Sequence, residues 1–137
     1  MHSLSLASGR GPLLRNFFEA WDHGPVVRVL YHEFKQYGHE PIDGLAMYFD
    51  YELGARKFVD PAGLSPSTTQ FLDQAIKPFI DFSADHLEKL THENGSPWHL
   101  VYYSDRKTLR DRIPDELVAG YTSGRFSNLV ENISMLS

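Results

Sequence analysis

Residues 21–38 read Trp-Asp-His-Gly-Pro-Val-Val-Arg-Val-Leu-Tyr-His-Glu-Phe-Lys-Gln-Tyr-Gly, and the rest of the chain is organised around them. Gly24 suits the backbone of a tight turn, and Pro25 suits the first position of a helix, where no N–H is needed. Apolar side chains then recur at helical spacing, and Gly38 stands where a helix C-cap is expected. The stretch predicts a turn and then an amphipathic helix over residues 25–37. Its apolar stripe comprises Val27, Leu30, Tyr31, Phe34 and Tyr37.

The composition is that of one globular domain. The chain has 137 residues, 42% hydrophobic and 23% charged, which is enough for a single core. It has no cysteine, so disulfides and thiolate chemistry are excluded. No apolar run approaches the ~20 residues of a membrane span, and the start lacks the features of a secretion signal. We expect one domain over residues 1–137, in the cytoplasm and without a membrane segment.

The charge narrows the class of partner. A formal net charge of −5 argues against general nucleic-acid binding, because that function is normally driven by a basic face. An acidic protein is instead suited to a basic protein partner.

Downstream, the pattern predicts one β-hairpin and several short helices. Alternating apolar residues predict the hairpin over residues 45–60, which should pack on helices or on another strand because a lone hairpin is marginal in water. Ser65, Ser83 and Ser96 stand where helix N-caps are expected, and Pro78 should end the first of these helices. The predicted fold class is mainly α (α+β), a compact multi-helix domain with one small β-hairpin.

The carboxyl-terminal part predicts a basic loop and two helices. A helix begins after Pro114 with acidic residues in its first turn, where they favour the helix dipole. A last helix from Phe126 is expected to be loosely attached. The basic loop is either a solvated surface or an anion or partner contact. Its cations are Arg106, Lys107, Arg110 and Arg112.

The histidines and serines do not form a recognisable catalytic or metal pattern. His32-Glu33 begins like the helical zinc-protease motif, but Gln36 stands where the second histidine is required. His86, His92 and His99 are not spaced for one helix face. There is no Gly-x-Ser-x-Gly elbow and no Gly-rich phosphate loop. We expect no metal, no cofactor and no catalytic residue.

Two ordered motifs carry a family resemblance. The first is Phe-Glu-Ala-Trp-Asp-His-Gly-Pro-Val-Val (residues 18–27) followed by Leu-Tyr-His-Glu-Phe-Lys-Gln-Tyr-Gly (residues 30–38). The second is Leu-x-x-Leu-Thr-His-x-x-Gly-Ser-Pro-Trp (residues 87–98). With the Ile113-Pro114 helix, they resemble the Panacea domain, the family of SocA-like antitoxins and GepA-related phage-associated proteins, over about residues 13–126. Family members usually begin with a further helix, so the N-terminal helix of this domain is expected to be missing or shortened.

The resemblance implies a function. It implies a non-enzymatic, antitoxin-like protein of a bacterium or phage that neutralises a cognate toxin by direct complex formation. The class of toxin stays open. A homodimer is a second partner to consider, because a missing helix would expose apolar surface. The alternative is a small hydrolase or regulatory enzyme that uses His32, His92 and nearby acids, which requires both histidines in one cleft.

The candidate partner-binding residues come from both motifs, which we expect to pack together. Large aromatic side chains are common at binding hot spots. Whether these residues bind a partner or maintain the fold is open at this point. The candidates are Trp21, His23, Tyr31, His32, Lys35, Thr91, His92 and Trp98.

Overall fold

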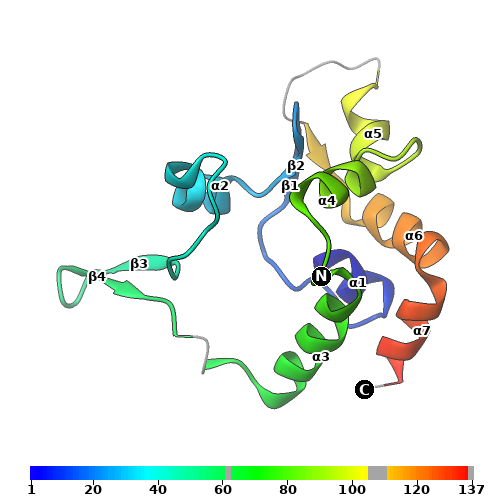
Figure 1. Ribbon diagram of the computed structural model, residues 1–137. Coiled ribbons are helices and arrows are strands. Elements are labelled where there is room, and N and C mark those ends of the chain that lie inside the picture. The colour runs from blue at the N-terminus through cyan, green and yellow to red at the C-terminus, as the bar shows by residue number, and fades with distance from the viewer. Residues whose placement is uncertain (61–62, 105–110, 136–137) are drawn as a thin grey trace.

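The structure is a computed structural model that describes residues 1–60, 63–104 and 111–135. Helices make up about half of the described chain, with one three-stranded and one two-stranded antiparallel sheet beside them (Figure 1). The predicted class, mainly α with a small β part, is confirmed. Three cations of the predicted basic loop, Arg106, Lys107 and Arg110, lie outside the described residues.

The first core cluster forms around helix α1 (His2–Ala7). Leu4 is 2% exposed and packs with Phe71, Ala75 and Ile133. These residues come from α3 (Pro66–Ile76) and α7 (Ser127–Ser134). The expectation of a loosely attached last helix is wrong, because Ile133 of α7 is 1% exposed in this core. A single domain over residues 1–137 and a shortened N-terminal helix stay predictions.

The three predicted serine caps are confirmed. In each, the hydroxyl oxygen accepts a hydrogen bond from the backbone N–H three residues later, at 3.1–3.2 Å. The first of the capped helices, α3, ends before Pro78 and continues as a 3₁₀ turn, η3 (Lys77–Phe79). The helices that follow Ser65, Ser83 and Ser96 are α3, α4 (Ala84–Thr91) and α5 (Pro97–Tyr102).

The three-stranded sheet corrects the prediction for the first motif. Its strands are β1 (Phe18–Trp21), β2 (Gly24–Val26) and β5 (Arg112–Ile113), in the order β2-β1-β5. Pro25 is not the first residue of a helix, since it pairs with Ala20 in β2. An edge strand tolerates proline, because an outward N–H is not needed there.

A second core cluster lies between this sheet and the helices. Ala20 of β1, Trp98 of α5 and Ile113 of β5 are buried together. Val118 packs against them from α6 (Asp115–Arg125), which begins with acidic residues as predicted. This cluster joins the first motif to the second.

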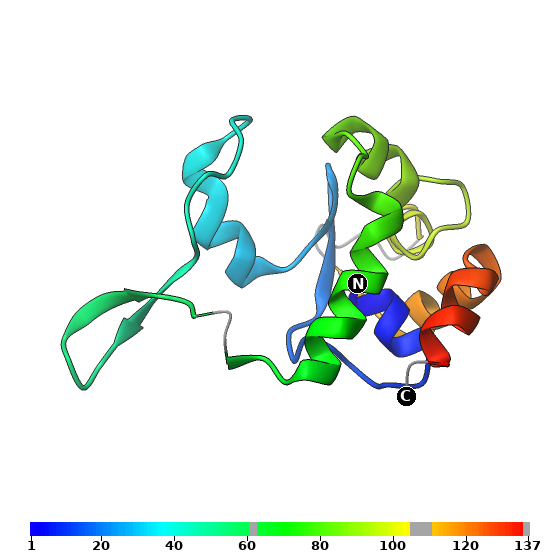
Figure 2. The ribbon, with the colours of Figure 1, turned by 60° about the horizontal axis from the view of Figure 1, so that its bottom comes forward.

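Residues 28–58 form an arm that extends to one side of the other elements in both views (Figures 1 and 2). The arm consists of α2 (Arg28–Phe34), the 3₁₀ turn η1 (Lys35–Tyr37), β3 (Met47–Asp50) and β4 (Ala55–Phe58). The predicted hairpin is confirmed, with Met47 opposite Phe58. The expected burial is not observed, because α2 has no buried residue and all four residues of β4 are exposed.

Candidate functional site

Trp98 joins the two sequence motifs. Its indole Nε1 donates a hydrogen bond to the carbonyl oxygen of Trp21 at 2.8 Å. The ring centroid of Trp98 lies 3.8 Å from that of His92 and 4.6 Å from that of Tyr102. Because Trp98 is 4% exposed, it is a core residue that fixes the β1–β2 hairpin against α5.

Gly24 is the point of closest approach between the hairpin and the end of α4. Its φ of +116° lies where side chains are rarely tolerated. A Cβ at this position would lie 3.3 Å from Cε1 of His92 and 3.4 Å from Oγ1 of Thr91. The two candidates Thr91 and His92 therefore pack against the turn of the first motif. The expected packing of the two motifs is observed at this turn, whereas His32 lies on the arm.

Thr91 and His92 also complete the end of α4. The Thr91 hydroxyl donates to the carbonyl oxygen of Glu88 at 2.8 Å, and Nδ1 of His92 lies 2.7 Å from the same oxygen. The backbone N–H of His92 donates to the same oxygen at 3.0 Å, so both side chains reinforce the last turn of the helix. The geometry gives both residues a role in the fold.

Glu19 is a buried anchor for the arm that the sequence analysis missed. Its carboxylate is 3% exposed and accepts hydrogen bonds from Arg28 Nε at 3.1 Å, Arg28 Nη2 at 2.9 Å and Trp21 Nε1 at 2.9 Å. The bidentate pair ties the first residue of α2 to β1. A single acid inside the apolar run of residues 17–21 was the signal that could have identified it.

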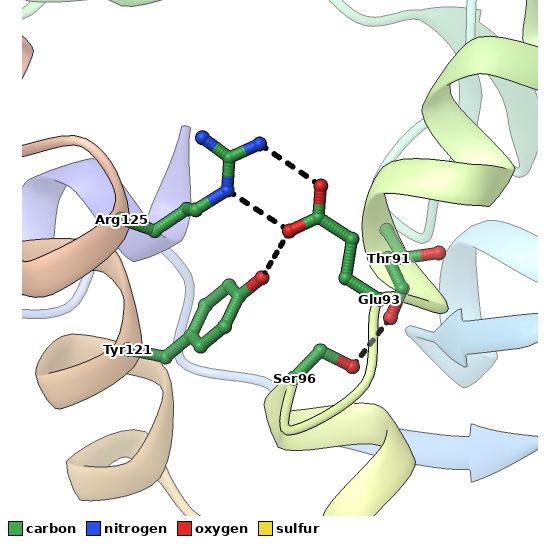
Figure 3. A network of polar contacts seen from close by, with 5 residues as sticks. All are labelled: Thr91, Glu93, Ser96, Tyr121 and Arg125. Carbon is green, nitrogen blue, oxygen red and sulfur yellow. Dashed lines mark hydrogen bonds and ion pairs between the residues drawn. The ribbon is translucent and has the colours of Figure 1, made fainter.

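A polar network at Glu93 ties the α4–α5 turn to α6 (Figure 3). Its carboxylate accepts from Tyr121 Oη at 2.6 Å and from Arg125 Nε and Nη2, both at 2.9 Å. The bonds from Arg125, and then that from Tyr121, lower the pKa of Glu93 to about 2. Burial, and then the bond to Glu93, raises the pKa of Tyr121 to about 12. The network was not predicted, because its members lie far apart in sequence.

A groove on the arm brings three candidate residues together. The groove has a volume of about 540 Å³ and lies between α2, η1 and the β3–β4 hairpin. The Glu33 carboxylate holds its two walls together, accepting a hydrogen bond from the Met47 N–H at 2.8 Å. Its lining comprises Tyr31, His32, Glu33, Lys35, Gln36, Tyr37, Gly44, Leu45, Met47, Arg56 and Phe58.

The candidates thus fall into two groups, one that lines the groove and one that surrounds Trp98, and Trp21 contacts both groups. Its ring centroid lies 4.9 Å from that of Tyr31 in the groove, while its carbonyl binds Trp98. His23, in the turn between β1 and β2, is exposed. In the described part of the chain, no hydrogen bond or ring contact joins His32 to His92. No group of three His, Asp or Glu side chains that could hold a metal ion occurs among the residues described.

Comparison with known proteins identifies the family. The model for "Antitoxin SocA-like, Panacea domain" matches residues 1–99, which include the arm and both motifs. The chain belongs to this Panacea family. The resemblance suggested for the helix after Pro114 lies beyond the matched residues of the Panacea model.

A curated relative of the chain is also an antitoxin by name. The Panacea chain is 29% identical over 100 residues to Antitoxin SocA of Caulobacter vibrioides, an alignment that covers 73% of this chain and 53% of the relative. It therefore spans about half the length of the curated relative it matches. No solved structure matches it significantly. Within the described ranges, no helix has the length and apolar character to cross a membrane.

Proposed function

We propose that this Panacea domain is a cytoplasmic antitoxin that neutralises a cognate toxin by binding it directly, without chemistry of its own. Membership of an antitoxin family supports the general role. The observation that carries the binding mechanism is the arm, which exposes large apolar side chains that a monomer would be expected to bury. Those at least 44% exposed are Val29, Leu30, Tyr31, Ile42, Leu45, Tyr48, Phe49, Tyr51, Leu53 and Phe58.

The eight candidate residues divide between contact and support. Tyr31, His32 and Lys35 line the exposed groove and are proposed to contact the toxin. His23 is exposed at the turn of the β1–β2 hairpin and is proposed to lie at the margin of that contact. The remaining candidates belong to the β1–β2 hairpin or pack on it, and this hairpin leads into the arm. They are Trp21, Thr91, His92 and Trp98.

The alternative, a small hydrolase or regulatory enzyme, has less support. It required His32 and His92 in one cleft beside a carboxylate. In the residues described, His32 lines the groove of the arm, whereas His92 packs on the buried Trp98. These positions favour a binding module over an enzyme that uses both histidines.

The proposal is tested by expressing the adjacent gene with and without this chain. If the adjacent gene is toxic, co-expression should restore growth, and the two proteins should copurify. A Tyr31→Ala/Lys35→Glu double variant in the groove should lose rescue and copurification. The matched control is Leu100→Ala, which truncates a half-exposed side chain on α5 and should leave both unchanged. A harmless adjacent gene together with no copurifying protein would contradict the proposal.

A further inference from the structure

The outer edge of β4 has backbone groups that no other described segment pairs with. The Val59 N–H donates to the carbonyl oxygen of Ala46 at 2.8 Å, which fixes the phase of the β3–β4 ladder. Bonded and non-bonded pairs alternate in an antiparallel ladder, so the N–H and C=O groups of Arg56 and Phe58 point away from β3. Among the described residues, the N–H groups of Arg56 and Phe58 have no hydrogen-bond partner.

The opposite edge of the hairpin is partly occupied. The outward N–H of Met47 in β3 donates to the Glu33 carboxylate from α2, at 2.8 Å. This side-chain oxygen takes the place that a neighbouring strand's carbonyl would have. β4 has no such cover in the part of the chain described, and an uncovered edge is a template for pairing with another chain.

The two faces of the hairpin carry different side chains beside this edge. Residues opposite each other share a face, so Arg56 and Phe58 lie on the same face as Phe49 and Met47. On the other face, Lys57 is already paired with Asp50 at 2.9 Å.

The two cations of the groove differ from the paired Lys57. Arg56 and Lys35 both line the groove, and neither forms an ion pair with a described carboxylate. Although the whole chain is acidic, this edge is suited to a partner that carries carboxylates.

We propose that β4 accepts an extended segment of a partner protein as a third strand, with an apolar side chain opposite Phe58 and a carboxylate opposite Arg56. Main-chain hydrogen bonds would supply affinity, and the alternate side chains would supply specificity. A third strand would also stabilise a hairpin that is marginal with two. A second copy of β4 is a poorer occupant, because it would bring another Arg56 and Lys57 to a cationic edge. The identity of the partner as the toxin rests on the proposed function.

A peptide probe tests strand addition without the toxin. The probe is a synthetic peptide of repeated Val-Thr-Glu-Thr, which places Val and Glu two residues apart on one face of a strand. The matched control peptide is Val-Thr-Lys-Thr. The glutamate peptide should bind ~10-fold more tightly than the lysine peptide, as expected for one favourable charge pair. Bound peptide should slow hydrogen exchange at the amides of Arg56 and Phe58.

Variants of Arg56 separate the backbone contribution from the charge. Arg56→Pro removes an outward N–H and leaves the β3–β4 hydrogen bonds in place, whereas Arg56→Ala keeps the N–H and removes the charge. The proline variant should bind the glutamate peptide roughly 5- to 10-fold more weakly than the alanine variant. Arg56→Glu should reverse the preference toward the lysine peptide. Circular dichroism checks that each variant is folded.

The outcomes are distinct. Equal binding of both peptides, no binding of either, or unchanged exchange at Arg56 and Phe58 would overturn strand addition. A homodimer that Arg56→Pro dissociates would also overturn it, and would assign the edge to a second copy. If the peptide binds as expected but the chain does not rescue growth, the proposed function fails and strand addition stands. If Arg56→Pro neutralises the toxin as well as the natural chain does, strand addition fails and the proposed function stands.

Discussion

The indole N–H of Trp98 donates a 2.8 Å hydrogen bond to the carbonyl oxygen of Trp21, across 77 residues of sequence. This bond connects α5 to the end of β1, the strand whose Glu19 anchors the first residue of the arm. The second motif of the Panacea signature therefore supports the base of the arm, while the first motif continues into it.

Replacement of this indole should destabilise the domain. Trp98→Phe keeps an aromatic ring but removes the 2.8 Å hydrogen bond to the Trp21 carbonyl and opens a small cavity. We expect a loss of about 2 kcal/mol in the free energy of unfolding, measured by urea denaturation. Leu100→Ala, at a half-exposed position on the same helix, should change it by less than about 0.5 kcal/mol. Equal midpoints for Trp98→Phe and the natural chain would show that the bond is dispensable.

A methyl group at Gly24 should be more harmful than one at Gly54. Both glycines have positive φ, +116° and +61°, but only at Gly24 would the new Cβ press on His92 and Thr91. Gly54→Ala should cost about 1 kcal/mol from backbone strain alone. Gly24→Ala should cost at least about 1 kcal/mol more, as measured by urea denaturation. Similar costs for the two variants would show that Thr91 and His92 move aside for the new methyl group at little cost.

Stability should depend on pH through Glu93. Its pKa is lowered from 4.5 to about 2 in the folded protein, so the stabilisation is fully present above pH 4.5 and is lost as the pH falls toward 2. Because the Glu93 side chain is 36% exposed, solvent screening limits the effect to about 1 kcal/mol.

The free energy of unfolding, measured between pH 6 and pH 2, tests whether Glu93 causes this pH dependence. Glu93→Gln should flatten the pH dependence in that window. Tyr121→Phe should flatten it less, because the Arg125 bonds are the larger cause of the shift. An unchanged pH profile in Glu93→Gln would show that other carboxylates cause the pH dependence of stability.

Loss of the Glu19 carboxylate should loosen the arm. Glu19→Ala removes the acceptor for Arg28 and Trp21, so α2 would lose its ion pair with β1 and rely on the ring contact of Tyr31 with Trp21. Limited proteolysis should cut the linker at residues 38–46 several-fold faster, because the rate follows the population of the opened state. Glu131→Ala, at an exposed site on α7, is the control, and its linker should be cleaved at the same rate as in the natural chain. Equal cleavage in both variants would show that Glu19 does not position the arm.

The histidines should not hold zinc. The described residues contain no cluster of three suitable ligands, and His32 and His92 make different contacts. Elemental analysis of the purified natural chain and of a His32→Ala/His92→Ala variant should show no zinc in either. One zinc per chain in the natural protein, lost in the variant, would overturn the binding-module proposal in favour of the enzyme.

The local signals in the sequence were sufficient for the helix caps and the hairpin at residues 45–60. A serine cap and a tight turn depend on a few neighbouring residues, so their outcome hardly varies with context. The same reasoning failed at Pro25, because proline suits both the first turn of a helix and an edge strand. Only the pairing with Ala20 decided between them.

The residues of the candidate site were anticipated unevenly for a related reason. Tyr31, His32 and Lys35 belong to a continuous motif and were found from it. Glu19 and Arg125 act through partners that the fold brings to them. The only local signal was the single acid in the apolar run of residues 17–21, and it does not say which partner Glu19 binds.

The sequence by itself determined the family, the helix caps and the periodicity of each apolar stripe. Tertiary structure alone decided which stripes are buried. The stripe at Phe71 and Ala75 is in the core, because α1 and α7 supply a matching apolar surface. The stripe at Leu30 and Tyr31 has the same helical spacing but stays half exposed on the arm. Burial requires a complementary surface from another segment, and no described segment provides one for the arm.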